Sequence, residues 1–244
     1  MKILLTIAYD GTNYFGWQMQ DNFVTVQEEI EKALSKLFNK AIEIRGASRT
    51  DRGVHALGQR GTFSVDTTIP MPNLPHALNN MLPRDIRIHK AQVVSQDFHP
   101  QYNAKNKTYR YKIYNAQFLD PVQNNYVWHI RSQLDLDKMQ RAAQFIPGEH
   151  DFAAFCATGS SAKTTVRTVY DISVKKDFDN IISIEINGNG FLYNMVRIIA
   201  GTLVYIGNGK LTVADMPVII QSKDRTLGGI TAPPQGLTLV EIKY

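Results

Sequence analysis

The order of strand-like and helix-like segments in the first half of the chain limits its fold more than any other feature. Strand-like segments alternate apolar and polar residues, and helix-like segments repeat apolar residues every three or four positions. In chain order the segments are 2–9 (strand), 26–38 (helix), 42–47 (strand), 59–66 (strand), 72–82 (helix) and 85–94 (strand). The first helix follows a capping-box sequence, T-V-Q-E at residues 25–28. This β-α-β-β-α-β order is typical of a ferredoxin-like sheet with helices on one face.

The second half repeats this order of elements without repeating the residues. Its segments are strands at 107–115, 126–130, 166–175, 181–187 and 237–243 and helices at 136–146, 191–206 and 212–220. We expect a hairpin turn at 176–180, and the apolar pattern lapses at 98–106, so we place the domain boundary there. The sequence predicts an α/β (α+β) protein with domains 1–104 and 105–244. Each domain is expected to be a ferredoxin-like half with a largely antiparallel sheet, and the halves are expected to meet around a central basic cleft.

Composition narrows the range of partners. The chain has 244 residues, of which 43% are hydrophobic and 20% charged, as in an ordinary globular protein. A formal net charge of +5 favours a polyanionic partner over a membrane or an acidic protein. The longest apolar run, 191–206, is shorter than the roughly 20 residues of a membrane span, and Asp10 interrupts the apolar N-terminal segment. A single cysteine, Cys156, excludes an internal disulfide and a cysteine-built metal site. We therefore expect a cytoplasmic protein with no membrane segment.

One carboxylate stands out between the second and third predicted strands. Residues 46–59 read G-A-S-R-T-D-R-G-V-H-A-L-G-Q, and the single acid among them is Asp51. Four arginines lie close to it in sequence: Arg45, Arg49, Arg52 and Arg60. Neighbouring arginines keep a carboxylate ionised and attract an anionic substrate. By itself, however, this pattern is more typical of a charged turn between two strands than of an active site.

Two further segments contain charged residues among apolar or aromatic ones. Arg197 is the only charged residue within 191–206, and a buried guanidinium requires a carboxylate or phosphate partner. The strand 107–115 is rich in tyrosine and basic residues, and its alternation puts Lys107 and Tyr109 on one face and Arg110 on the other. Such aromatic residues are more often core than base-stacking residues. The basic cluster nevertheless indicates a groove that follows a phosphate backbone.

Four segments resemble, in the same order, motifs of the tRNA pseudouridine synthase A family. They are the D-containing loop at 46–56, K-T-Y-R-Y-K at 107–112, F-L-Y-N-M-V-R at 191–197 and T-A-P-P-Q-G-L-T-L at 231–239. Within the loop, Ser48 and Arg52 stand where the family commonly has glycine and alanine. The resemblance covers the chain from the D-G-T sequence at 10–12 to the C-terminus.

The resemblance implies an isomerase that converts uridine to pseudouridine at positions 38–40 of the tRNA anticodon stem-loop. Asp51 would be the nucleophile, Arg197 would orient it and lower its pKa, and Tyr109 would stack on the target uracil. The candidate substrate-binding residues are Tyr109, Arg49, Arg52, His55, Lys107 and Arg110, although a single histidine beside a turn is more typical of a structural role. The reaction exchanges one bond for another, so it requires no redox cofactor, nucleotide or metal. Family members act as homodimers with tRNA across both subunits.

Two other functions remain open from the residues. A non-catalytic RNA-binding module would explain the charge and the tyrosines, because β-α-β-β-α-β sheets often bind single strands through aromatic residues. It gives no reason for R-T-D at 49–51 together with a buried arginine. A related synthase that acts on another RNA is the second alternative. The residues leave open whether the ribose carbon or uracil C6 is attacked, which tRNAs are used, and where the dimer interface lies.

Overall fold

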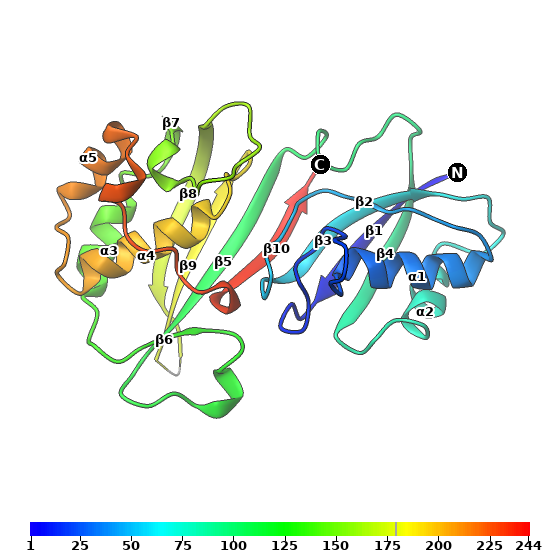
Figure 1. The fold of residues 1–244 in the computed structure, drawn as a ribbon, viewed down its shortest axis with the longest axis horizontal. Helices are drawn as coiled ribbons and strands as arrows, with labels where there is room; N and C mark the ends of the chain where they lie inside the picture. Colours follow the sequence, from blue (N-terminus) through cyan, green and yellow to red (C-terminus); the bar gives the residue numbers. More distant parts are fainter. Residues whose placement is uncertain (179) are drawn as a thin grey trace. The chain divides into compact units, whose positions relative to one another are not determined.

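The computed structural model describes residues 1–178 and 180–244 and divides into two compact units (Figure 1). Unit 1 comprises Met1–Lys105 with Thr238–Tyr244, and unit 2 comprises Asn106–Leu237. The sequence analysis put the last strand in the second half. It belongs instead with unit 1, because β10 (Leu237–Lys243) pairs in parallel with β3 (His55–Ser64).

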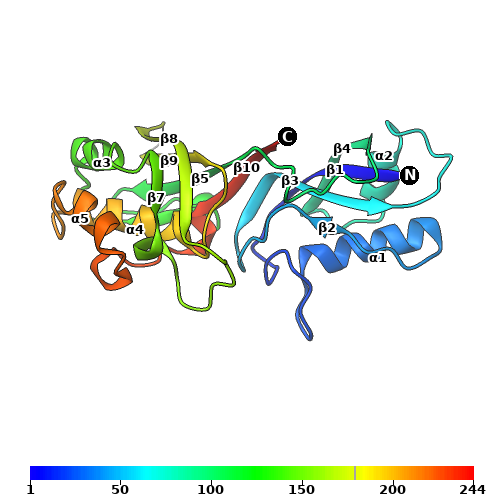
Figure 2. The same cartoon turned by 90° about the horizontal axis from the view of Figure 1, so that it is seen from above.

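The unit 1 sheet has the strand order β4-β1-β3-β10. β1 (Lys2–Tyr9) is antiparallel to both β3 and β4 (Ile86–Val94), and the short β2 (Arg45–Gly46) is antiparallel to β3. Helix α1 (Val26–Phe38) lies along one face of this sheet (Figure 2) and contacts α2 (Leu74–Asn79). The element order of the first half is therefore the predicted β-α-β-β-α-β order.

The start of α1 follows from its capping residue. The backbone nitrogen of Glu28 donates to the Thr25 side chain at 3.3 Å, which confirms the N-terminal cap predicted from the T-V-Q-E sequence. At the other end Asn39 adopts a left-handed conformation with φ of 51°, which ends the helix.

The predicted strand at 42–47 is wrong for most of its length, because only Arg45–Gly46 pair as β2. Side chains of α1 take the place of a partner strand: Ile42 N donates to Ser35 Oγ at 3.1 Å, and Ile44 N donates to Glu31 Oε1 at 2.9 Å. The following strand, β3, begins at His55 rather than at residue 59. The D-containing motif therefore runs into the strand itself.

The unit 2 sheet has the order β5-β9-β8-β7, with antiparallel neighbours, and β6 pairs in parallel with β5. Its strands are β5 (Asn106–Asn115), β6 (Trp128–Ile130), β7 (Gly148–Asp151), β8 (Val166–Lys176) and β9 (Ile181–Gly188). β8 and β9 form the expected hairpin, and residue 179 of its predicted turn lies outside the described residues. The predominance of antiparallel pairing in both units confirms the predicted α+β class.

The helices of unit 2 are α3 (Leu136–Ala143), α4 (Met195–Gly207) and α5 (Asp215–Ser222), and short 3-10 turns occur at Pro121–Gln123, Ala153–Phe155, Arg225–Leu227 and Pro234–Gly236. α4 begins later than residue 191, because Asn194 has a left-handed φ of 61° that an α-helix cannot contain. α4 is buried almost throughout, as its uniformly apolar sequence predicts. Within the described part of the chain, no helix combines the length and apolar character that crossing a membrane would require.

Candidate active site

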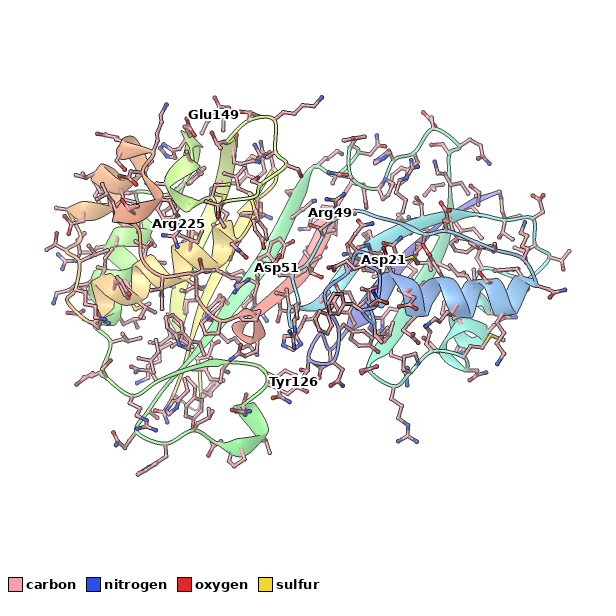
Figure 3. All side chains as sticks on the ribbon, in the orientation of Figure 1. Asp21, Arg49, Asp51, Tyr126, Glu149 and Arg225 are labelled. Atoms are coloured by element: carbon pink, nitrogen blue, oxygen red, sulfur yellow. The ribbon has the colours of Figure 1, made fainter. Side chains whose placement is uncertain are left out.

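Asp51 occupies the first position of a tight turn that leads into β3. Its carbonyl oxygen accepts a hydrogen bond from Val54 N at 3.1 Å, and Gly53 in the third position has a φ of +75°. A type II turn needs a positive φ at this position, which explains the glycine. Figure 3 shows Arg49 and Asp51 on this loop. The carboxylate is therefore presented from a turn with a defined backbone rather than from a flexible loop.

Residues on both sides of Asp51 are held by the segment that follows β1. The carbonyl of the buried Thr50 accepts from Trp17 N at 3.1 Å, and its hydroxyl lies 2.8 Å from the hydroxyl of Tyr9. On the other side, Gly53 N donates to the carbonyl of Tyr14 at 3.3 Å. Because the backbone is tied on each side, the position of Asp51 is fixed before a substrate binds, and this favours a chemical role.

Ser48 does not require a glycine-like backbone. Ser48 is not one of the described non-glycine residues that have a positive φ. Its carbonyl accepts from Gln59 Nε2 at 2.7 Å, which ties the start of the loop to β3. A serine is therefore compatible with the backbone conformation at this position.

His55 is a buried residue at the start of β3, with 6% of its surface exposed. Its Nδ1 lies 3.1 Å from Gly11 N, which donates to it, and 3.1 Å from Asp10 Oδ1. These contacts join the segment after β1 to the Asp51 turn and favour the structural role. A contact of His55 with substrate stays a prediction.

Arg49 and Arg52 are both exposed beside Asp51. The guanidinium carbon of Arg52 lies 4.1 Å from the centre of the Phe15 ring, and Phe15 stacks on Phe23 with ring centres 4.1 Å apart. A cation over an aromatic face is held in place while its edges remain available to an anion. The sequence analysis missed Phe15, although its place in an aromatic loop just before α1 was a signal for it.

In unit 2 the inward face of β5 carries Lys107, Tyr109 and Tyr111, as the alternation predicts. Tyr109 is 6% exposed, and its ring meets Phe191 edge-on with centres 5.2 Å apart. Phe191 therefore sets the orientation of the Tyr109 ring, a role that the sequence analysis missed. Tyr111 is a core residue: its hydroxyl donates to the carbonyl of Pro233 at 2.7 Å, and burial raises its pKa.

Arg197 lies in the first turn of α4 with a fixed guanidinium. Its Nε donates to the carbonyl of Ala232 at 2.7 Å, and its Nη1 donates to Asn194 Oδ1 at 2.7 Å. Ala232 N in turn donates to the carbonyl of Arg197 at 3.2 Å. Two of the predicted motifs, at 191–197 and 231–239, thus meet at this residue. The pairing of Arg197 with Asp51 of unit 1 stays a prediction.

The two basic candidates of β5 have different surroundings. Lys107 is 9% exposed, and burial lowers its pKa to about 8, with a further contribution from the charge of Arg167. Arg110 points to the other face and binds Glu185 Oε2 through Nε at 3.0 Å and Nη2 at 2.8 Å. Lys107 therefore lies on the same face of β5 as Tyr109, whereas Arg110 lies on the opposite face in an ion pair with Glu185. Contact of Arg110 with RNA stays a prediction.

Each unit therefore gathers part of the predicted set. Unit 1 holds Asp51 with Arg49, Arg52 and His55, and unit 2 holds Lys107, Tyr109 and Arg197 on inward or half-buried positions, with Arg110 apart. Within the described residues, no group of three or more histidine, cysteine, aspartate or glutamate side chains is arranged to hold a metal ion. Unit 1 thus offers a carboxylate with arginines close to it in sequence, and unit 2 offers a lysine and a tyrosine on one face of β5.

Comparison with known proteins places these motifs in one family. A family model described as tRNA pseudouridine synthase matches residues 5–103 and 142–244. The tRNA pseudouridine synthase A of Ruminiclostridium cellulolyticum is 54% identical over 243 residues, covering 100% of this chain and 99% of the relative. Proteins of the same name from Thermoanaerobacter pseudethanolicus and Acetivibrio thermocellus are 52% and 51% identical, with the same coverage of 100% and 99%. With half of all residues shared from end to end, the chain belongs to the tRNA pseudouridine synthase family.

Proposed function

We propose that this protein isomerises uridine to pseudouridine on the 3′ side of the tRNA anticodon stem-loop, at positions 38–40, with Asp51 as the nucleophile. The observation that carries the proposal is the Asp51 turn, held through Thr50 and Gly53, in a chain that matches the family over its whole length. An ionised carboxylate on a preorganised backbone can attack an electrophilic carbon.

The reaction balances without a cofactor. The bond from the ribose carbon to uracil N1 breaks, and a bond from the same ribose carbon to uracil C5 forms. Asp51 attacks either that ribose carbon or uracil C6 and is released when the new bond is complete. The hydrogen at C5 leaves as a proton, and N1 gains a proton, so nothing is oxidised or reduced.

The remaining residues have binding and positioning roles in this proposal. Tyr109 stacks on the target uracil, which must leave its own stack to be attacked, and Arg197 orients the nucleophile. Arg49, Arg52 and Lys107 attract the phosphate backbone. We also propose that the protein works in the cytoplasm as a homodimer with tRNA across both subunits. Sedimentation velocity that shows a fully active monomer would contradict the dimer.

The deciding experiment compares Asp51→Asn with the wild type in a tritium-release assay. Uridine labelled at C5 in tRNA loses its tritium when the new bond forms. We expect release to fall to background in Asp51→Asn while tRNA affinity is retained, because asparagine keeps the size of the side chain but is a poor nucleophile. Asp21→Asn, at an exposed aspartate of the same unit, is the matched control and keeps full activity (Figure 3).

Three other results would contradict parts of the proposal. Tritium release by correctly folded Asp51→Asn would remove the residue from the nucleophile role. A wild type that binds tRNA but releases no tritium would indicate the non-catalytic RNA-binding module. Chemical mapping that finds pseudouridine outside the anticodon stem-loop would indicate a synthase with another target.

A further inference from the structure

Arg167 is a half-buried cation near the start of β8. Its Nη1 donates to the carbonyls of Thr164 at 2.8 Å and Val166 at 2.6 Å. Among residues 1–178 and 180–244, no carboxylate forms an ion pair with Arg167, and its Nε and Nη2 have no hydrogen-bond acceptor. Burial lowers its pKa, so water compensates this charge poorly.

A second buried cation lies close to it. The charge of Arg167 is, after burial, the second cause of the lowered pKa of Lys107, so the two cations repel each other. The strand register supports this proximity: Lys107 on β5 pairs with Gly188 on β9, and Gly188 pairs with Val169 on β8, two residues from Arg167.

Gly190 lies next to Nε of the Arg167 guanidinium. A side chain added at Gly190 would come within 3.8 Å of Arg167 Nε and Cδ, and glycine places no atoms there. The Arg167 Nε has no hydrogen-bond acceptor in the described part of the chain. It lies next to the place where any residue other than glycine at position 190 would have its Cβ atom. An Nε–Nη2 edge presents two parallel donors, the geometry that binds two oxygens of a phosphate.

Two neighbouring, partly desolvated cations repel each other, whereas an anion between them would offset this repulsion and accept the hydrogen bonds of Arg167 Nε and Nη2. Lys107 and Tyr109 share the inward face of β5 and are two residues apart, which corresponds to about 7 Å along a strand. From this geometry we infer that Lys107 and Arg167 together bind one phosphodiester group of the RNA, next to the base on which Tyr109 stacks. The inference rests on the proposed function, because it takes the uracil to lie on Tyr109.

The test is the salt dependence of tRNA binding by Arg167→Gln. Glutamine keeps hydrogen-bonding capacity but removes the charge. We expect the slope of log K against log salt to become less steep by about 0.7 to 0.9, which corresponds to one lost phosphate contact. In tritium release, KM should rise about tenfold while kcat stays within about twofold, because the phosphate contact positions the substrate. Arg167→Lys, which keeps the charge, should restore most of the slope.

The matched control is Arg141→Gln. Arg141 is an exposed arginine of unit 2 that already has an acid partner, since its Nε lies 3.0 Å from Asp137 Oδ2. The same substitution there should leave slope and KM unchanged. A double variant of Lys107→Met and Arg167→Gln should lose less affinity than the sum of the single losses, because both residues bind the same phosphate.

Several outcomes would overturn the inference. An unchanged slope in folded Arg167→Gln excludes the phosphate contact, and strictly additive losses in the double variant exclude a single shared phosphate. Binding of inorganic phosphate that depends on Arg167 but leaves tRNA affinity unchanged, compared with chloride of equal ionic strength, would mean that the site takes free phosphate rather than RNA. These results are independent of the proposed reaction: a wild type without tritium release but with the expected slope change would refute the reaction and leave the phosphate site standing.

Discussion

Replacing Lys107 by methionine should stabilise the free protein while weakening RNA binding. The Lys107 ammonium is buried, and its pKa lies at about 8 instead of 10.5. At 1.36 kcal/mol per pKa unit, this difference means that the charged side chain destabilises the folded state by about 3 kcal/mol at pH 7. Methionine fills a similar volume without a charge, so Lys107→Met should raise the free energy of unfolding by up to about 3 kcal/mol.

The sign of the pH dependence distinguishes charge from packing. Below pH 8 the lysine is protonated in both the folded and the unfolded chain, so the whole penalty is present. Between about pH 8 and 10.5 the unfolded chain binds more protons than the folded chain at this site, and wild-type stability therefore rises with pH relative to the variant. The difference between wild type and Lys107→Met should shrink across this window.

Urea denaturation at pH 7, 8.5 and 10 measures this difference directly. Lys112→Met is the matched control, since Lys112 lies on the other face of β5 and is not buried. The change with pH should be larger for Lys107→Met than for Lys112→Met. A Lys107→Met effect that is equally large at pH 7 and pH 10 would refute the argument, because packing alone would then account for it.

Two further predictions concern the proposed active-site residues. Tyr109→Phe should keep most of the activity and Tyr109→Ala should lose roughly 5- to 150-fold, because stacking on a base is worth about 1–3 kcal/mol; equal and severe losses in tritium release would show that the hydroxyl acts chemically. Arg197→Met should abolish tritium release and still unfold cooperatively, with a loss of about 1–3 kcal/mol from its bonds to Ala232 and Asn194; near-normal turnover would refute its role in orienting the nucleophile.

Features of the fold that depend only on residues close together in the sequence could be predicted from it. The alternation of β5 correctly separated Lys107 from Arg110, and the Thr25 cap correctly marked the start of α1. The strand at 42–47 could not be excluded in this way, since its backbone groups bond to side chains of Glu31 and Ser35 on α1. The alternation of apolar and polar residues indicates which side chains are buried. It does not indicate which groups form hydrogen bonds with the backbone N–H and C=O groups.

In the candidate site, too, the residues within motifs could be predicted from the sequence, whereas contacts between distant segments could not. The motif order pointed to Asp51, Tyr109 and Arg197 because family motifs carry them. It could not reveal that Phe15 lies under Arg52 or that Phe191 contacts Tyr109, since these contacts join segments far apart in the chain. The last strand was assigned to the wrong unit for a related reason: its pattern predicts a strand but does not identify its partner.

The features of unit 2 that weaken its fold lie near Tyr109. Lys107 carries a charge that burial opposes, and the charge of Arg167 lowers the pKa of Lys107 further. A stable core would replace such a pair by apolar side chains, as the expected effect of Lys107→Met illustrates. An RNA phosphate bound between the two cations would return the pKa of Lys107 toward 10.5 and remove the repulsion. In the proposed complex, the free energy by which these charges destabilise the free protein would therefore contribute to affinity for RNA, which is a physical reason for such a pair beside Tyr109, the residue proposed to stack on the substrate.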